Sequence, residues 1–189
     1  IRSLEKGRYG LGFAKDFHDK TKEELIGMLH VPTSERQFIM YEALRKGATV
    51  DELFELTKIK KYFIEQMKEL VDEENALIAA KGAIPEKDVL AQAKKDGFSD
   101  KYLSQILDVP ENDIRAKRIE YGIVETWEGI HVSGTQDAAY YYSSYNGTDK
   151  DPVNNDRPKI MILGSGPNRI GQGIEFDYCC VHAANALKE

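Results

Sequence analysis

The feature that most constrains the fold is a series of capping residues and glycines that divides residues 21–122 into short segments. A hydroxyl residue followed three positions later by Glu or Gln is typical of a helix start, because the two side chains bond the free N–H groups of the first turn. Helices end at glycines in a left-handed conformation. The capping pairs are Thr21 with Glu24, Ser34 with Gln37 and Thr49 with Glu52, and the glycines are Gly47, Gly82, Gly97 and Gly122. The pattern predicts helices at residues 21–30, 34–46, 50–57, 61–81, 85–96, 100–107 and 110–121.

A repeat with an offset of 50 residues runs through this region. Each copy reads helix, glycine stop, hydroxyl cap, short helix and further helix, which predicts two similar helical units that pack on each other. The matched pairs are Gly47 and Gly97, Thr49 and Ser99, Leu53 and Leu103, Leu56 and Ile106, Ile59 and Val109, and Ile64 and Ile114.

The apolar residues of these helices fall on single faces, which predicts a core rather than a catalytic array. The two stripes consist of Leu25, Leu29, Phe38, Tyr41 and Leu44, and of Phe63, Met67, Leu70 and Leu77. The four histidines lack the spacing of metal ligands; they are His18, His30, His131 and His182. We therefore expect no metal site and no catalytic residues.

The same helical pattern also resembles a helix-turn-helix, so an independent helical adaptor or nucleic-acid-binding module is the alternative interpretation. Residues 21–122 contain sixteen Lys or Arg and twenty Asp or Glu residues, a net charge of −4. The second helix of each pair carries both signs of charge, whereas phosphate binding favours a cationic surface. We therefore expect no nucleic-acid partner.

Near the end of the chain, an apolar run at residues 159–163 leads into a glycine-rich turn and a helical pattern at residues 174–187. This order predicts the first strand, loop and helix of an α/β domain, cut off where that domain begins. A dinucleotide-binding loop needs a third glycine or alanine where this chain has Arg169, and the Gly-Lys-Ser/Thr of a phosphate-binding loop is absent. The loop alone gives weak support for a nucleotide site.

The composition indicates a globular chain with one domain, or one domain and part of another. The chain has 189 residues, 41% of them hydrophobic, and a net charge of −6. No secretory leader and no apolar run of about 18 residues, as a membrane helix needs, is visible. Cys179 and Cys180 are the only cysteines and are adjacent, so we expect them to be small helical residues in a reducing, cytoplasmic protein.

The segments on either side of the helices are predicted to be less regular. Residues 1–20 are expected to bury little and to be the tail of an upstream domain, with Arg2 and Arg8 on the surface rather than on a phosphate. Residues 130–132 are expected to be extended and residues 146–158 to be a linker. A tyrosine cluster is expected to cover a neighbouring surface rather than to stack on bases or sugars; it consists of Tyr140, Tyr141, Tyr142 and Tyr145.

The string from Gly164 to His182 is far more specific than its glycines. It closely resembles the start of the second synthetase half in the large subunit of the carbamoyl phosphate synthetase family. Residues 1–5 and 7–10 resemble the end of the first synthetase half. Phe63 and the motifs at residues 32–36, 56–59, 97–100 and 140–145 resemble the helical oligomerisation domain between the halves. Residues 124–131 depart from the family's Val-Asp-Thr-Cys-Ala-Ala-Glu-Phe.

The resemblance implies a mainly α chain, in which a multi-helix oligomerisation domain with an internal helical repeat precedes a truncated βα unit of an α/β pre-ATP-grasp domain. The implied division is the tail of the first synthetase half at residues 1–20, the oligomerisation domain at residues 21–150, a linker at residues 151–158 and the start of the second half at residues 159–189.

The resemblance also implies the activity of the parent enzyme, a ligase that makes carbamoyl phosphate from bicarbonate, glutamine-derived ammonia and two ATP for arginine or pyrimidine biosynthesis. ATP, Mg²⁺ and K⁺ bind in ATP-grasp domains that this chain does not contain, and a glutaminase small subunit is a partner. The chain itself is expected to be an inactive spacer that self-associates into dimers or tetramers, with no cofactor, nucleic acid or membrane of its own.

One functional element is expected within the chain. By resemblance, Gly173 and Glu175 line the tunnel that carries carbamate between the two ATP sites. A glycine leaves room for a small planar anion, and a polar wall lowers the cost of placing that anion in the protein. The alternative is that Glu175 only occupies the first turn of a helix, where a carboxylate is favourable. The glycine-rich loop before them consists of Gly164, Gly166, Arg169 and Gly171.

The apolar run at residues 159–163 lacks the rest of its expected sheet. An unpaired apolar strand edge recruits a neighbour. We therefore expect this strand to pair with residues 130–132 or with another chain.

Overall fold

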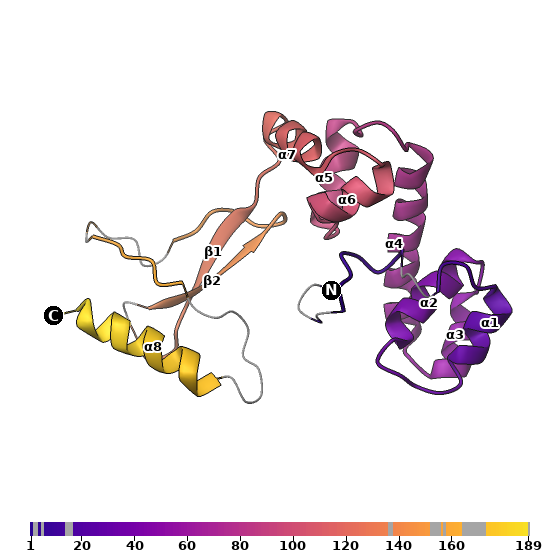
Figure 1. The fold of residues 1–189 in the computed structure, drawn as a ribbon, viewed down its shortest axis with the longest axis horizontal. Helices are drawn as coiled ribbons and strands as arrows, with labels where there is room; N and C mark the ends of the chain where they lie inside the picture. The colour runs from indigo at the N-terminus through magenta and orange to yellow at the C-terminus, as the bar shows by residue number, and fades with distance from the viewer. Residues whose placement is uncertain are drawn as a thin grey trace.

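All the helices expected between residues 21 and 122 are present in the computed structural model, with ends shifted by at most two residues (Figure 1). The structure describes residues 1, 4, 6–13, 17–135, 138–151, 156, 158–163 and 173–188. The helices of this region are α1 (Lys22–Met28), α2 (Arg36–Arg45), α3 (Val50–Thr57), α4 (Lys61–Ala79), α5 (Lys87–Lys95), α6 (Asp100–Leu107) and α7 (Glu111–Glu120).

Two of the three expected capping boxes are present. The hydroxyls of Thr21 and Thr49 each accept the backbone N–H of the glutamate three residues later. The carboxylate of that glutamate in turn accepts the backbone N–H of the threonine. The box expected at Ser34 is wrong, because α2 begins after Glu35, which makes no side-chain capping bond. The side chain that bonds to the backbone before α2 is Thr33, whose hydroxyl accepts the N–H of Glu35 at 3.3 Å.

The repeat also includes matched backbone conformations at positions outside the residue pairs that the 50-residue offset identified. Lys58 and Asp108 end α3 and α6 in the left-handed conformation, with φ of 57° and 55°. Lys60 and Pro110, which precede α4 and α7, share φ near −55° and ψ of 136°. The expected glycine stops have φ of 91°, 92°, 93° and 73°, at Gly47, Gly82, Gly97 and Gly122.

Each copy of the repeat has its own hydrophobic cluster, and α4 belongs to both. We call α2, α3 and the first half of α4 the first unit, and α5, α6 and α7 the second unit. Ile64 and Val71 on α4 pack in the first cluster, Leu77 packs in the second, and Leu70 contacts both. Figure 1 shows α4 running from α1–α3 to α5–α7 as the connection between them.

The first expected apolar stripe is buried throughout. In the second stripe only Leu77 is buried, whereas Met67 and Leu70 are half-buried. Phe63 is 59% exposed. It lies in the first turn of α4, where it contacts Tyr62 edge to face rather than the core.

The N-terminal residues are packed more deeply than expected. Gly10, Gly12 and Phe17 are buried, and the guanidinium of Arg8 lies 4.2 Å from the ring centre of Phe38. Arg8 also donates a 2.9 Å hydrogen bond to Glu35. The expectation of a surface arginine is therefore wrong for Arg8, and Arg2 lies outside the described residues.

After α7 the chain forms an antiparallel hairpin of β1 (Thr126–His131) and β2 (Ala139–Ser144), with Gly129 opposite Tyr141. The extended segment expected at residues 130–132 is thus mostly the end of β1. Lys150 bonds to β1 through both its N–H and its carbonyl, at 2.9 Å each. Part of the expected linker at residues 146–158 is therefore paired with the hairpin.

The tyrosines of β2 do not cover a neighbouring surface as expected. Tyr140 is 75% exposed, and Tyr141 and Tyr142 are also exposed. The hydroxyls of Tyr141 and Tyr142 donate to Asp151 and Glu128, so these side chains bond along the hairpin itself. A two-stranded hairpin offers little surface for burying large rings.

The expected strand at residues 159–163 is not present. Residues 158–163 have no regular structure, and Met161 and Leu163 are more than 80% exposed. Residues 130 and 131, which were one expected partner of this strand, pair with β2 instead. The helix expected at residues 174–187 is present as α8 (Gly173–Ala186). Among the described helices, none combines the length and apolarity that crossing a membrane would require.

Candidate functional site

A buried carboxylate at the centre of α4 joins the two units. Glu74 is fully buried, and one of its oxygens, Oε2, accepts the hydroxyls of Tyr41 and Tyr102 at 2.6 and 2.8 Å. Its other oxygen, Oε1, accepts Nη2 of Arg45. Tyr41 and Arg45 come from α2 and Tyr102 from α6, so the three donors lie on both sides of α4. We call these four residues the Glu74 network.

Burial determines the charge states in this network. It raises the pKa of Tyr41 and of Tyr102 far above the usual range, and the neighbouring negative charge of Glu74 adds to the effect. Burial lowers the pKa of Arg45, but attraction by Glu74 and Glu42 outweighs this and raises it overall. Neutral tyrosines and a charged arginine therefore surround the carboxylate, as a buried charge requires.

The N-terminal segment covers the Glu74 network. The N–H of Gly12 donates to the hydroxyl of Tyr102 at 3.0 Å. A side chain at Gly12 would place its Cβ 2.5 Å from Arg45 and from Glu74. Only glycine fits at this position, so the segment is held directly on the connection between the units.

A second charged cluster lies inside the second unit. Asp100 accepts Nζ of Lys94 at 2.8 Å and Nε of Arg118 at 2.8 Å. Both cations are buried, and Arg118 also donates to the carbonyl of Ile123, where the chain leaves α7 for the hairpin. Lys94 lies 5.0 Å from the ring centre of Tyr145. The cluster therefore connects the helices to the start and end of the hairpin.

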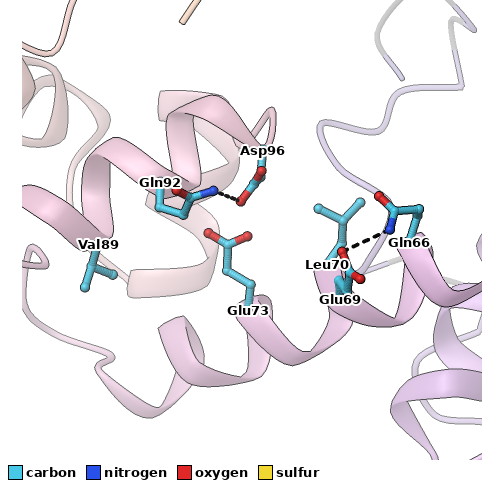
Figure 2. A pocket seen from close by; sticks show the side chains of 7 residues that line it. All are labelled: Gln66, Glu69, Leu70, Glu73, Val89, Gln92 and Asp96. Atoms are coloured by element: carbon cyan, nitrogen blue, oxygen red, sulfur yellow. Dashed lines mark hydrogen bonds between the residues drawn. The ribbon is translucent and has the colours of Figure 1, made fainter. Parts of the chain in front are cut away.

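A groove of about 600 Å³ separates α4 from α5. Figure 2 shows the carboxylate of Glu73 pointing across it toward Gln92 and Asp96. Burial, followed by a hydrogen bond to Asp96 and repulsion from its charge, raises the pKa of Glu73 to about 7. Gln92 donates to Asp96 at 2.7 Å. The groove thus holds one carboxyl group, that of Glu73, whose charge changes near neutral pH.

The structure describes few of the site residues expected from the sequence. The glycine-rich loop, with Gly164, Gly166, Arg169 and Gly171, lies outside the described residues. Gly173 is the first residue of α8 and Glu175 the third, so Glu175 is in the first helical turn. The described residues contain no group of three or more His, Cys, Asp or Glu side chains placed to hold a metal ion.

The comparisons identify the helical region. Residues 1–122 match the family model of the carbamoyl-phosphate synthetase large chain, oligomerisation domain. The chain belongs to the carbamoyl phosphate synthetase large-chain family. Residues 156–189 match a second model, the carbamoyl phosphate synthase preATP-grasp domain. The fold agrees with this membership, since the helical repeat covers most of the first match and α8 lies within the second.

Relatives in this family are similar over the whole chain. The chain is 43% identical to the carbamoyl phosphate synthase large chain of Archaeoglobus fulgidus and 43% identical to that of Vibrio cholerae, and it spans 18% of each. It is 40% identical to the arginine-specific, chloroplastic large chain of Arabidopsis thaliana and spans 16% of it. The alternative of a helix-turn-helix module finds no support in these matches.

Sequence reasoning missed the Glu74 network, although one signal was present. Glu74 lies four residues after Leu70 and three before Leu77, so it falls within the apolar stripe of α4. A lone carboxylate in such a stripe predicts buried donors from other elements. Those donors, Tyr41 and Tyr102, are 33 and 28 residues away, so the helical pattern did not identify them.

Proposed function

We propose that this chain is the spacer and self-association module within a carbamoyl phosphate synthetase large chain. The observation that carries the proposal is the Glu74 network, which joins both helical units and the N-terminal segment through one buried group. A module joined in this way keeps what precedes and follows it at a set separation. The match to an oligomerisation domain supports the self-association.

The division of the chain forms part of this proposal. We assign residues 1–20 to the tail of the first synthetase half, residues 21–150 to the oligomerisation domain, residues 151–158 to a linker and residues 159–189 to the start of the second half. The preATP-grasp match at residues 156–189 supports the last assignment. The packing of Gly12 against Tyr102 means that the first segment is attached firmly to the second.

The reaction belongs to the proposed parent. It forms carbamoyl phosphate from bicarbonate, glutamine-derived ammonia and two ATP, with Mg²⁺ and K⁺ in its ATP-grasp domains and a glutaminase small subunit as partner. We place it in the cytoplasm and in arginine or pyrimidine biosynthesis. We assign no step of the reaction to the described side chains, whose proposed work is to position the neighbouring domains.

For the parent, we propose that Gly173 and Glu175 line the carbamate tunnel, next to the loop that contains Gly164, Gly166, Arg169 and Gly171. The position of Gly173 at the N-terminus of α8 supports this, because free N–H groups at a helix start favour an anion. Replacing Gly173 by Leu in the whole enzyme should uncouple the two ATP-consuming steps. Unchanged coupling would contradict the tunnel assignment.

Sedimentation velocity of the chain over a wide concentration range tests the main proposal. Reversible dimers or tetramers are expected. A monomer at all concentrations would contradict self-association by these residues and leave the chain as a spacer only.

A further inference from the structure

Residues 9–13 lie across the junction between the two units, and we call them the strap. The side chain of Leu11 packs against the apolar cluster of the first unit. The N–H of Gly12 donates to the hydroxyl of Tyr102, on α6 of the second unit, at 3.0 Å. Figure 1 shows the start of the chain beside α4, where the two units meet. The strap therefore contacts both units at the point where they join.

Two buried glycines bring the backbone of the strap into direct contact with side chains of both units. A Cβ at Gly10 would overlap the ring of Tyr102, from the second unit. A Cβ at Gly12 would lie 2.5 Å from the side chain of Arg45, from the first unit, and from that of Glu74 on α4. Because the strap fits without a gap, a change in the separation of α2 and α6 would either clash with it or leave it without contacts.

Phe13 ends the strap in a conformation that depends on the same two units. Its φ of 52° lies in the left-handed region, which bulky residues rarely adopt and which costs free energy. Its ring lies edge to face with Tyr102, at 6.2 Å between ring centres, and the guanidinium of Arg45 lies 5.9 Å from its centre. The ring also stacks on His18 at 5.6 Å. These contacts offset the backbone strain, so their loss on separation of the units would favour release of the strap.

A chain of hydrogen bonds links the strap to the carboxylate at the centre of α4. The N–H of Gly12 donates to the hydroxyl of Tyr102, and this hydroxyl donates to Oε2 of Glu74 at 2.8 Å. Tyr41 of the first unit donates to the same oxygen at 2.6 Å. Successive hydrogen bonds polarise and strengthen one another. The docked strap therefore strengthens the bond that holds α6 to α4.

We propose that the strap is a lock on the relative orientation of the two units. It docks only in the orientation of this structure, and its release lets α6 move relative to α2. The coupling is reciprocal, so a change in the orientation of the units also releases the strap. The consequence for the parent rests on the proposed function. Because the strap belongs to the tail of the first synthetase half, a movement there would reach the hairpin through α6 and its ion pair with Arg118.

The alternative is that the strap only covers a junction that the Glu74 network already holds rigid. The two interpretations differ in what a displaced strap does to the helices. A lock predicts that α6 moves relative to α2 when the strap leaves, whereas a passive cover predicts that only the strap changes.

The first experiment displaces the strap with Gly12→Ala, whose added Cβ does not fit, and measures the distance between the units. Spin labels are attached at Lys46→Cys, directly after α2, and at Ala116→Cys on α7, both exposed positions. Cys179 and Cys180 are replaced by serine so that they carry no label. Double electron–electron resonance of labelled chain diluted in unlabelled chain gives the distance within one molecule. Gly12→Ala should shift or broaden the distribution of this distance.

A second variant and a control complete this measurement. Leu11→Asp puts a charge at the half-buried position that packs on the first cluster, while every side chain of the Glu74 network is kept. It should have the same effect as Gly12→Ala, and it supplies the test if circular dichroism shows that Gly12→Ala does not fold. The matched control is Gly27→Ala on α1, where an added Cβ would meet nothing within 4 Å. It should leave the distance unchanged.

Hydrogen exchange measures the docking of the strap itself. In Gly12→Ala and in Leu11→Asp, the N–H groups of the strap should exchange about tenfold faster or more, as expected for the loss of a hydrogen bond or the burial of a charge. The first turn of α6 should also exchange faster, because the strap no longer supports the bond between Tyr102 and Glu74. Gly27→Ala should change neither rate.

The outcomes decide between a lock and a cover. Faster exchange of the strap together with a changed distance distribution supports the lock. Faster exchange of the strap with unchanged distances and unchanged exchange in α6 overturns it. If neither variant speeds exchange of the strap, the close fit at Gly12 is wrong and the inference fails as well. Sedimentation velocity of the same variants reports on self-association separately, so a chain that is always monomeric can still show the lock.

Discussion

The two helical units share a backbone but fill corresponding positions in different ways. In the second unit, Lys94, Asp100 and Arg118 form a buried ionic cluster. An offset of 50 places Leu44, Val50 and Lys68 at the same positions of the first unit. Leu44 is packed in the apolar core, and Lys68 pairs with Asp72 at the surface.

The difference teaches that caps and left-handed residues specify this backbone, whereas the interior residues follow from what each unit must hold. The ionic cluster of the second unit reaches Ile123 and Tyr145, at the two ends of the hairpin. The first unit has no such task, and an apolar core is sufficient for it. Buried ion pairs add little net stability compared with apolar packing, so the cluster is better explained by attachment of the hairpin.

The largest expected effect comes from the residue that both units share. Glu74→Ala leaves Arg45 with only Glu42, at 3.4 Å, as an acidic partner. It also removes the carboxylate acceptor of Tyr41 and Tyr102. Loss of one partner of a buried charge pair, with its hydrogen bonds, should lower the free energy of unfolding by about 4–5 kcal/mol. Urea denaturation measures this. The control Asp72→Ala removes an exposed carboxylate from the same helix and should cost less than about 1 kcal/mol.

A comparison of matched interior positions should give unequal effects. Asp100→Asn leaves the buried Lys94 without a carboxylate and Arg118 with only the more distant Glu125, at 3.7 Å. It should destabilise the chain by about 3 kcal/mol. Val50→Ala, at the matched position of the first unit, removes only apolar contacts and should cost about 1 kcal/mol. Equal losses of unfolding free energy in the two variants would show that the charges of the ionic cluster do not contribute to its stability. Denaturation midpoints of the two variants decide between these results.

A comparison of matched backbone positions should give equal effects. Gly47 and Gly97 have φ of 91° and 93°, and an added Cβ would meet nothing within 4 Å at either position. Alanine would therefore introduce only backbone strain, about 1–2 kcal/mol in each case. If thermal unfolding shows that one variant is clearly less stable than the other, the two glycine turns are not equivalent.

The smallest expected effect is the acid sensitivity of the second unit. Burial raises the pKa of Asp100, but hydrogen bonds from Lys94 and Arg118 outweigh this and lower it overall. A lowered pKa means that the stabilisation is complete above the unfolded-state pKa of about 4 and is lost as the pH falls through the folded-state value. Melting temperatures between neutral pH and about pH 3 should fall less steeply for Asp100→Asn than for the unchanged chain. Parallel curves would contradict this role for Asp100.

The sequence predicted the local structure well because the signals for helix ends are local. The caps at Thr21 and Thr49 mark the starts of α1 and α3, and the four glycine stops mark the ends of α2, α4, α5 and α7. Contacts between helices were harder to predict, since Gly12 and Tyr102 are 90 residues apart. The strand expected at residues 159–163 failed for a related reason: its apolar pattern suits a sheet, but a strand forms only where neighbouring strands satisfy its backbone.

The match of residues 156–189 to the preATP-grasp model was predictable, because the string from Gly164 to His182 within it already resembles this family. The proposed tunnel role of Gly173 and Glu175 was reached by resemblance alone, because no spacing or periodicity in the sequence indicates a tunnel wall. The exposure of Phe63 was not predictable for a different reason. Phe63 lies in phase with Met67 and Leu70, and helical periodicity alone cannot separate a buried position from an exposed one at the end of a helix.

The sharing of α4 by both units has a consequence for how such a chain tolerates insertions and deletions. Each residue added to or removed from the middle of the helix would turn one unit about 100° around the other and move it about 1.5 Å along the axis. A change of two residues would reverse the relative facing of the N-terminal segment and the hairpin, whereas a change of about a full turn would nearly preserve it. The length of α4, 19 residues, therefore sets the relative orientation of the two units. Only insertions or deletions close to a whole number of helical turns would preserve that orientation.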